Sequence, residues 1–426
     1  MSEIKKLFTN SFIIFVGTIV GSIFAYLFNM MMGRLLGPEQ YGELTALMSL
    51  MMIVAAGGSA ITIISMKYSA DYFNQKKIAQ LKKFILSFSK IVLLLGIILV
   101  LIGMLFSSVI VDFLSGVDKL ALTLVLFNLI FGLLIVLNKG ALQGLQRFLS
   151  VSVIGSVEMF LRLGLGLLLV YLGYQLNGAI LAIILATALA YSITFWPMRD
   201  ILQTKEKIKS DEKIDTKSIL AYSWPTLIAT LLLVFGINFD IIIIKHYFAP
   251  EQAGMYAAVS TIAKIIFYLT GPIATVMFPM ISENISKKIK HYRLFLLSVI
   301  MTLLASLIVL GAYTVAPGKI INLLYGSSYV EFYYLLPEVG LVMVLYSLIN
   351  LVVNYYLVLK NFLFLWIFSI GIIVQIILIS FFHESILQVV RMFILSFSAI
   401  FVCMFVYYLY LKWDNIKLII SENGKS

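Results

Sequence analysis

Long apolar runs along the whole chain are the sequence feature that most limits its possible folds. The chain has 426 residues, of which 62% are hydrophobic and only 12% are charged, which is too few charges to cover a soluble domain. Runs of about 18 or more apolar residues recur from end to end, and such runs fit membrane helices better than the short alternating strands of a lipid-facing barrel. The sequence therefore predicts an all-α polytopic membrane protein.

Twelve segments are long enough to be transmembrane helices, since about 20 apolar residues cross the hydrocarbon core. They are residues 11–33, 43–66, 84–107, 120–138, 149–172, 176–196, 218–244, 257–281, 294–314, 335–358, 362–381 and 388–411. Six precede and six follow a charged connector. We therefore predict an N-terminal six-helix lobe (1–196), a cytoplasmic linker (197–217), and a C-terminal six-helix lobe (218–426) with a short cytoplasmic tail.

The distribution of Lys and Arg predicts the orientation of these helices. If both termini are cytoplasmic, 23 of the 31 Lys and Arg residues fall in inner segments and four fall in outer segments. Cytoplasmic loops of membrane proteins carry such an excess of positive charge. The net charge of +11 is therefore read as a topology signal and not as a nucleic-acid-binding surface. We expect a multi-pass protein of the cytoplasmic membrane.

A short motif occurs twice, 212 positions apart. Residues 34–44 read RLLGPEQYGEL, and residues 246–256 read HYFAPEQAGMY. Each copy follows one long apolar run and precedes another, so the chain resembles two related halves joined end to end. Because each half has six spans, the halves should be related by a pseudo-two-fold axis along the membrane normal, with a substrate path at the seam. The alternative is a convenient turn that is merely used twice.

Both copies are predicted to be turns at the outer face, just after the first span of each half. Pro38 and Pro250 should end a helix, because proline lacks the backbone N–H that a helix interior needs. Gly42 and Gly254 should let the chain reverse, because glycine adopts turn conformations readily. We therefore expect these four residues to be structural.

Ionisable residues inside membrane spans are expensive and are candidates for function. Glu158 and Arg162 lie four residues apart on one predicted helix, so their side chains share a face and can pair. In a functional interpretation they face a central cavity, where Arg162 offers its charge to an anionic substrate. In a structural interpretation they form a self-neutralised pair.

Lys264, Asp240 and Asn29 complete the candidate substrate-binding residues. Lys264 lies inside the eighth span and either faces a cavity or extends to the outer surface along its aliphatic stem. Asp240 is near the outer end of the seventh span, where it can pair with Lys264, bind a coupling cation or cap a helix. Asn29 either lines a hydrophilic cavity or bonds between helices, and the second use is commoner.

The sequence gives no sign of an enzyme. It contains no serine–histidine–acid set, no glycine-rich phosphate loop and no spacing of metal ligands, so we expect no catalytic residue, metal or cofactor. The single cysteine, Cys403, lies in an apolar run and excludes a disulfide framework. The loops are too short for a catalytic domain, which argues against ATP-driven transport by this chain alone.

Three segments give the chain a resemblance to polysaccharide flippases, the O-antigen and repeat-unit exporters of the multidrug/oligosaccharidyl-lipid/polysaccharide superfamily. They are GRLLGPEQYGEL at 33–44, NFDIIIIKHYFAPEQAGMYAAVSTIAK at 238–264 and MFPMISE at 277–283. The resemblance implies two six-helix lobes around a central cavity. It also implies alternating access that moves a polyprenyl-diphosphate-linked oligosaccharide from the inner to the outer leaflet, with Arg162 and Lys264 available to its diphosphate.

The partners expected from this resemblance are the lipid-linked oligosaccharide, membrane lipids and, in addition, polysaccharide polymerase or assembly proteins. Three alternatives stay open. Lipid II flippases of the same superfamily carry two extra helices, for which this chain has no room. Multidrug extruders often have a carboxylate in the first span, and residues 11–33 contain none. A membrane scaffold that transports nothing would not need Arg162 or Lys264.

Overall fold

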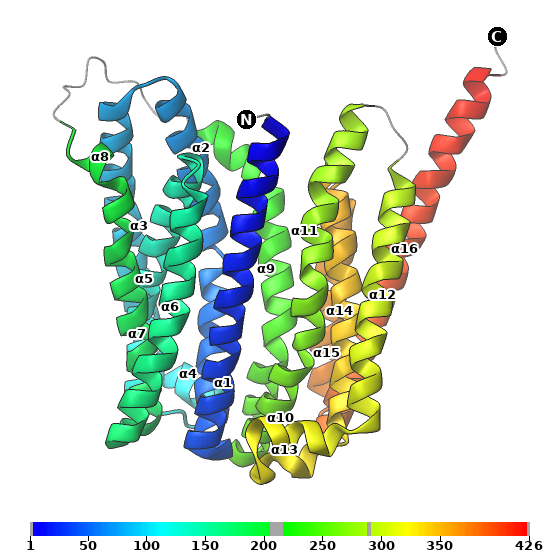
Figure 1. The fold of residues 1–426 in the computed structure, drawn as a ribbon. Helices are drawn as coiled ribbons and strands as arrows, with labels where there is room; N and C mark the ends of the chain where they lie inside the picture. Colours follow the sequence, from blue (N-terminus) through cyan, green and yellow to red (C-terminus); the bar gives the residue numbers. More distant parts are fainter. Residues whose placement is uncertain (1–2, 205–215, 288–290, 424–426) are drawn as a thin grey trace. The chain divides into compact units, whose positions relative to one another are not determined.

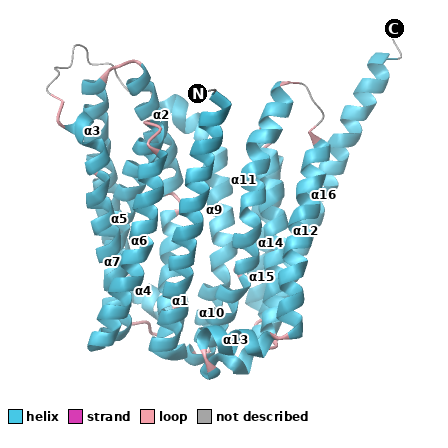
Figure 2. Ribbon diagram, viewed as in Figure 1, coloured by secondary structure: helices cyan, strands magenta, loops and turns pink. Residues whose placement is uncertain are grey.

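The protein is built from long helices. The computed structural model describes residues 3–204, 216–287 and 291–423, and these residues contain helices of the α, 3-10 and π types but no β-strand (Figures 1 and 2). The predicted all-α polytopic fold class is therefore confirmed. Most of the predicted linker, residues 205–215, lies outside the described residues. The last helix continues beyond residue 411, where the final span was predicted to end, to Asn423.

The helices follow the order of the predicted spans. The first half contains α1 (Glu3–Ala55), α2 (Gly58–Asn74), α3 (Ile78–Leu105), α4 (Ser107–Phe113), α5 (Lys119–Gly144), α6 (Phe148–Leu169), the π-helical turn η1 (Val170–Tyr174), α7 (Gln175–Thr194), η2 (Trp196–Met198) and α8 (Arg199–Leu202). The second half contains α9 (Thr216–Tyr247), α10 (Pro250–Ala263), α11 (Ile265–Ser286), α12 (Tyr292–Val315), α13 (Pro317–Tyr325), η3 (Ser327–Phe332), α14 (Leu335–Val358), α15 (Leu363–Phe381) and α16 (Ile386–Asn423).

The described residues contain ten stretches that are long and apolar enough to cross a membrane, against twelve predicted spans. Two of the ten, Val16–Ala55 and Phe148–Leu202, each overlap two predicted spans, so the count of twelve stays a prediction. In the first stretch Gly37 leaves the helical conformation (φ 74°), and in the second Gly173 does so (φ 93°). Glycine adopts such positive φ values without steric penalty. Figure 1 shows the chain turning back at the lower end of α1.

The two halves repeat one order of elements, which extends the duplication beyond the short motif. In each half a long first helix is followed by a helix that starts at the repeated proline, Pro38 or Pro250. That second helix is interrupted in both halves, at residues 56–57 in the first and at Lys264 in the second. A short helix, α4 or α13, follows the third crossing in each half.

Contacts within the chain divide it into two compact units. Unit 1 contains Met1–Leu231 and Ile241–Ala257, and unit 2 contains Leu232–Asp240 and Ala258–Ser426. The chain thus changes from one unit to the other three times, twice within α9 and once within α10. The lobe boundaries at 196 and 218, which the sequence suggests, stay a prediction.

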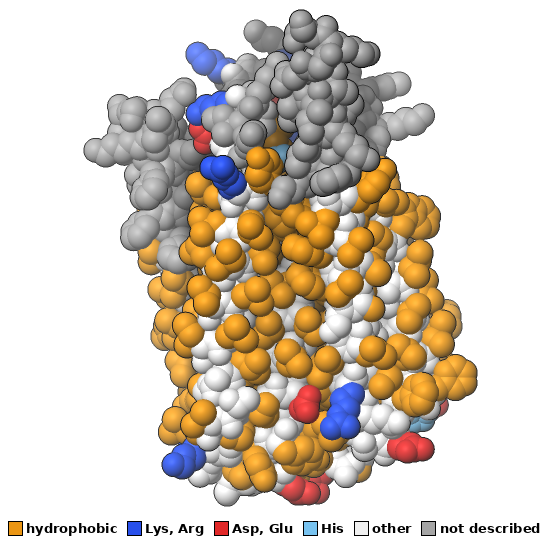
Figure 3. All heavy atoms as spheres, turned by 90° about the vertical axis from the view of Figure 1, so that its right-hand side faces the viewer, with side chains coloured by type: hydrophobic (Ala, Val, Ile, Leu, Met, Phe, Trp, Pro, Cys, Tyr) orange, Lys and Arg blue, Asp and Glu red, His pale blue; other side chains and the backbone are white. Residues whose placement is uncertain are grey.

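The side chains that face outward are largely apolar. On α12, for example, Leu297, Met301, Leu304 and Ile308 are all exposed. Figure 3 shows hydrophobic side chains across the middle of the displayed face and charged side chains toward its ends. Such a band is the surface that a lipid bilayer requires of the protein that it surrounds.

Inside unit 1, helices α2 and α5 pack with their backbones in close contact. A Cβ added to Gly144 would lie 2.2 Å from the Met66 carbonyl oxygen, and one added to Gly140 would lie 2.7 Å from that of Thr62. Ser65 donates a hydrogen bond across the same contact to the Leu137 carbonyl, at 2.7 Å. Small residues four apart are a common means of bringing membrane helices together.

We expect Gly144→Ala to lower the thermal stability of the purified protein, and Gly132→Ala to leave it unchanged or raise it. Both glycines lie in α5, where alanine is favoured over glycine by about 1 kcal/mol. No atom lies within 4 Å of a Cβ added at Gly132, whereas the one at Gly144 meets backbone. Such overpacking costs about 1–3 kcal/mol. The measurement is the midpoint of thermal unfolding in detergent, and equal midpoints would contradict this contact.

Candidate functional site

Glu158 is held by two other helices and not by its neighbour on α6. One carboxylate oxygen accepts a hydrogen bond from Lys139 of α5 at 2.8 Å, and the other accepts one from Thr187 of α7 at 3.3 Å. The predicted pairing of Glu158 with Arg162 is therefore replaced by a pairing with Lys139. The reason is the length of α5. The sequence placed Lys139 in a loop, but α5 continues to Gly144 and therefore includes Lys139.

Arg162 is left without a fixed anionic partner. Its side chain makes no hydrogen bond or ion pair with the described residues, and its Nε is buried without a hydrogen-bond acceptor. Its Cζ lies 6.0 Å from the centre of the Phe28 ring, at the outer limit of a cation–π contact. Glu158 acts on the guanidinium only through space. A cation held in a membrane segment without a bonded counter-ion is a candidate for binding an anion.

Unit 2 contains a second charged cluster, formed by Asp240, Ser260 and Lys264. The Lys264 Nζ lies 3.8 Å from one Asp240 oxygen, and the Ser260 hydroxyl donates to the other at 2.5 Å. Only 8% of the lysine side chain and 3% of the aspartate side chain are exposed. Of the alternatives for Asp240, the structure shows the pairing with Lys264, and it places Lys264 at the break between α10 and α11.

Asn29 is bonded within its own helix. Its side-chain amide donates to the Ala25 carbonyl at 2.9 Å, and among the described residues it makes no hydrogen bond to another helix. A role in binding substrate stays a prediction for Asn29.

The repeated motifs meet each other in unit 1. A Cβ added to Gly42 would lie 2.7 Å from the Gly254 Cα, and one added to Gly254 would fall on the Pro38 carbonyl group. Both glycines lie inside helices, so the prediction that they reverse the chain is wrong. In the first copy Gly37 makes the reversal, and Pro38 and Pro250 lie at the starts of the helical segments that follow, where proline is tolerated.

Polar contacts surround this meeting point and include residues that sequence reasoning missed. Asp118 caps the start of α5 through the Leu120 and Ala121 amides. Asn177 donates to the Asp118 carboxylate at 3.0 Å. His246 stacks on the Phe113 ring with 4.1 Å between ring centres. The one sequence signal for this cluster was the motif itself, since His246 is the first residue of its second copy.

The described residues contain no group of three or more His, Cys, Asp or Glu side chains that could hold a metal ion. The ionic clusters instead pair each carboxylate with a lysine and a hydroxyl. In each cluster the lysine neutralises the charge of the carboxylate, and the hydroxyl donates a hydrogen bond to it.

The fold is that of transporters of the MOP superfamily. An inward-facing multidrug resistance MATE family transporter of that superfamily has a TM-score of 0.76 at 14% identity, with 94% of this chain and 96% of that chain covered. A MOP superfamily transporter from Pyrococcus furiosus has a TM-score of 0.65 at 17% identity, with 96% and 95% covered. An outward-facing MATE family transporter has a TM-score of 0.65 at 16% identity, with 94% of each chain covered.

Sequence comparison identifies the family. The model of the family described as polysaccharide biosynthesis protein matches residues 7–285, well over half of the chain, and the chain therefore belongs to this family. A comparison with curated protein sequences gave no match. The predicted relationship to a polysaccharide family is confirmed by this match, and the fold is that of solved MOP superfamily transporters.

We expect Lys264→Met to destabilise the protein strongly and the double variant Asp240→Asn/Lys264→Met to recover most of the loss. The single substitution leaves a buried carboxylate without its cation, which costs about 3–5 kcal/mol, whereas removing both charges is close to neutral. Thermal unfolding in detergent measures both effects. The control is Lys90→Met, because Lys90 is an exposed lysine of α3. If the single variant were as stable as the control, the ionic contact would be unimportant.

Proposed function

We propose that this protein flips a polyprenyl-diphosphate-linked oligosaccharide from the inner to the outer leaflet by alternating access, for the biosynthesis of a surface polysaccharide. The observation that carries the proposal is the match of residues 7–285 to the polysaccharide biosynthesis family in a chain with the fold of MOP transporters. The chain is placed in the cytoplasmic membrane, with both termini cytoplasmic, as the positive charge of its predicted inner segments favours.

The chemistry of such a substrate requires cations within the membrane. A diphosphate carries negative charge that must be neutralised when it leaves water, and arginine binds phosphate oxygens through its planar set of donors. Arg162 suits this role, because its guanidinium has no ion pair with the described residues and its Nε lacks an acceptor. Glu158 keeps its own partners, Lys139 and Thr187, and does not need Arg162.

Lys264 is proposed as a second cation for the substrate, but unlike Arg162 it has a carboxylate partner within the protein. It is already paired with Asp240, so an anion has to compete with that carboxylate for the ammonium group. Arg162 therefore has the stronger physical case, and Lys264, Asp240, Glu158 and Asn29 follow as predicted substrate-binding residues. A polymerase or another assembly protein that receives the product is a proposed partner.

We expect Arg162→Gln to restore surface polysaccharide poorly when it is expressed in a strain that lacks this gene. Loss of a charge-assisted hydrogen bond of about 1.5–3 kcal/mol corresponds to a decrease in transport of about tenfold or more. Arg162→Lys should keep part of the activity, because it keeps the charge. The measurement is surface polymer together with lipid-linked intermediate retained inside the cell, after each variant has been checked for membrane expression.

Arg391→Gln is the matched control, because Arg391 is an exposed arginine of α16 and should tolerate the change. Normal surface polymer in the deletion strain would overturn the flippase proposal unless a second flippase compensates. The solved structures with this fold include multidrug transporters. Deletion that raises drug susceptibility while the surface polymer stays intact would therefore assign the chain to that function.

A further inference from the structure

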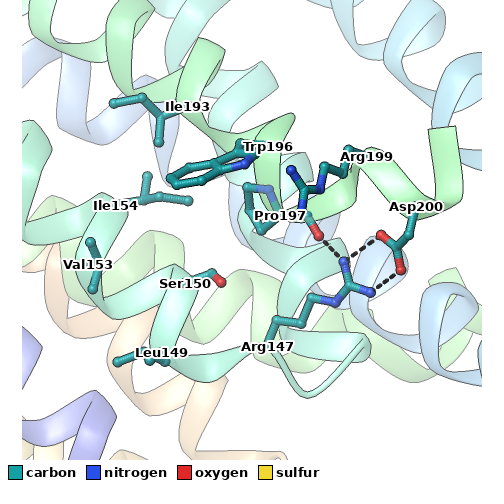
Figure 4. Close-up of a pocket in the computed structure, with 10 residues that line it drawn as sticks. All are labelled: Arg147, Leu149, Ser150, Val153, Ile154, Ile193, Trp196, Pro197, Arg199 and Asp200. Atoms are coloured by element: carbon teal, nitrogen blue, oxygen red, sulfur yellow. Dashed lines mark hydrogen bonds and ion pairs between the residues drawn. The ribbon is translucent and has the colours of Figure 1, made fainter. Parts of the chain in front are cut away.

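A groove opens beside η2 and α8 at one end of unit 1 (Figure 4). It has a volume of about 610 Å³ and is lined by residues of α6, the end of α7, η2 and α8. It lies just past Thr194, where α7 ends. Lys82 of α3 donates to the Thr204 carbonyl at 3.1 Å, directly after α8. The groove is thus at a basic end of the helices.

The wall of the groove is apolar and exposed. Leu149 and Val153 lie one turn apart on α6 and are 61% and 50% exposed. Ile193 of α7 lines the groove together with them. Trp196 closes one edge and is 70% exposed. Tryptophan is typical of the interface between hydrocarbon and headgroups. An occupant of this wall therefore has an apolar chain.

The rim of the groove carries a cation that no described residue neutralises. Arg147 donates to both oxygens of Asp200 and to the Pro197 carbonyl, so its charge is matched and its position is fixed. Arg199 lines the same groove and is exposed, and its guanidinium makes no hydrogen bond or ion pair with the described residues. Figure 4 shows its side chain extending toward Trp196, and the Arg147–Asp200 pair lies nearby. The rim therefore has an excess positive charge of one.

We propose that this groove binds an anionic phospholipid of the surrounding membrane. The phosphate lies at Arg199, Trp196 packs against the glycerol region, and an acyl chain covers Leu149 and Val153. Basic pockets between membrane helices bind acidic headgroups in this way. A soluble anion would leave the apolar wall uncovered. A zwitterionic lipid would bring its own cation together with its phosphate, so the excess positive charge of the rim would stay unmatched. The site is independent of the proposed transport function.

The test follows the fluorescence of Trp196 in lipid nanodiscs. A protein that keeps only this tryptophan, with Trp224, Trp366 and Trp413 changed to phenylalanine, is reconstituted in phosphatidylcholine. A minor fraction of brominated lipid is then added, either phosphatidylglycerol or phosphatidylcholine. Bromine quenches tryptophan on contact, so we expect stronger quenching by the anionic lipid. Arg199→Gln should reduce this preference about tenfold, as loss of one charge-assisted hydrogen bond predicts.

Trp366 provides a matched control, because it is also 70% exposed and lies on α15. A protein that keeps only Trp366 should be quenched equally by the two brominated lipids. Equal quenching of Trp196 by both lipids, or a preference that survives Arg199→Gln, would overturn the proposal. If the single-tryptophan proteins fail to fold, thermal stability of the parent chain decides. Phosphatidylglycerol should raise its unfolding midpoint, and the increase should be absent from Arg199→Gln.

Discussion

Close contact between helix backbones is the interaction on which the rest of this structure depends. Lipid offers helices no hydrophobic reason to associate, because the tails that surround them are as apolar as leucine. Van der Waals packing at short range has to hold the helices together instead. In unit 1 it does so where Gly140 and Gly144 of α5 lie against the backbone of α2. Such contacts fix helix positions closely enough for the few charged side chains to find their partners.

The charged side chains use these fixed positions in two ways. Glu158 lies on α6 and is hydrogen-bonded to two other helices, through Lys139 of α5 and Thr187 of α7. Asp240 is likewise held by Ser260 and Lys264. In both clusters the protein pairs a buried charge as it must. Arg162 differs because the described helices bring no carboxylate into contact with it, and this difference supports a role outside the protein's own packing.

The sequence predicted the membrane crossings well because they depend on local composition. Apolar runs determine where helices lie. The sequence reasoning did not single out Gly37 or Gly173, at which the backbone leaves the helical conformation within continuous stretches. Side-chain pairs between different helices were harder to predict, because such pairing depends on which helices are neighbours in the fold. Lys139 was assigned to a loop because the apolar run ends at 138, and so its bond to Glu158 was not foreseen. The motif was recognised, but Gly42 and Gly254 looked like turn residues because the contact between their helices is tertiary.

The contact between Gly42 and Gly254 links the two halves of the duplicated sequence at equivalent positions. After a gene duplicates, its copies usually diverge independently, one position at a time. Here each copy supplies the space that the other needs, so neither glycine can gain a side chain unless the opposite backbone moves. We therefore expect the two positions to change only together, so that the glycine persists in both copies of the motif.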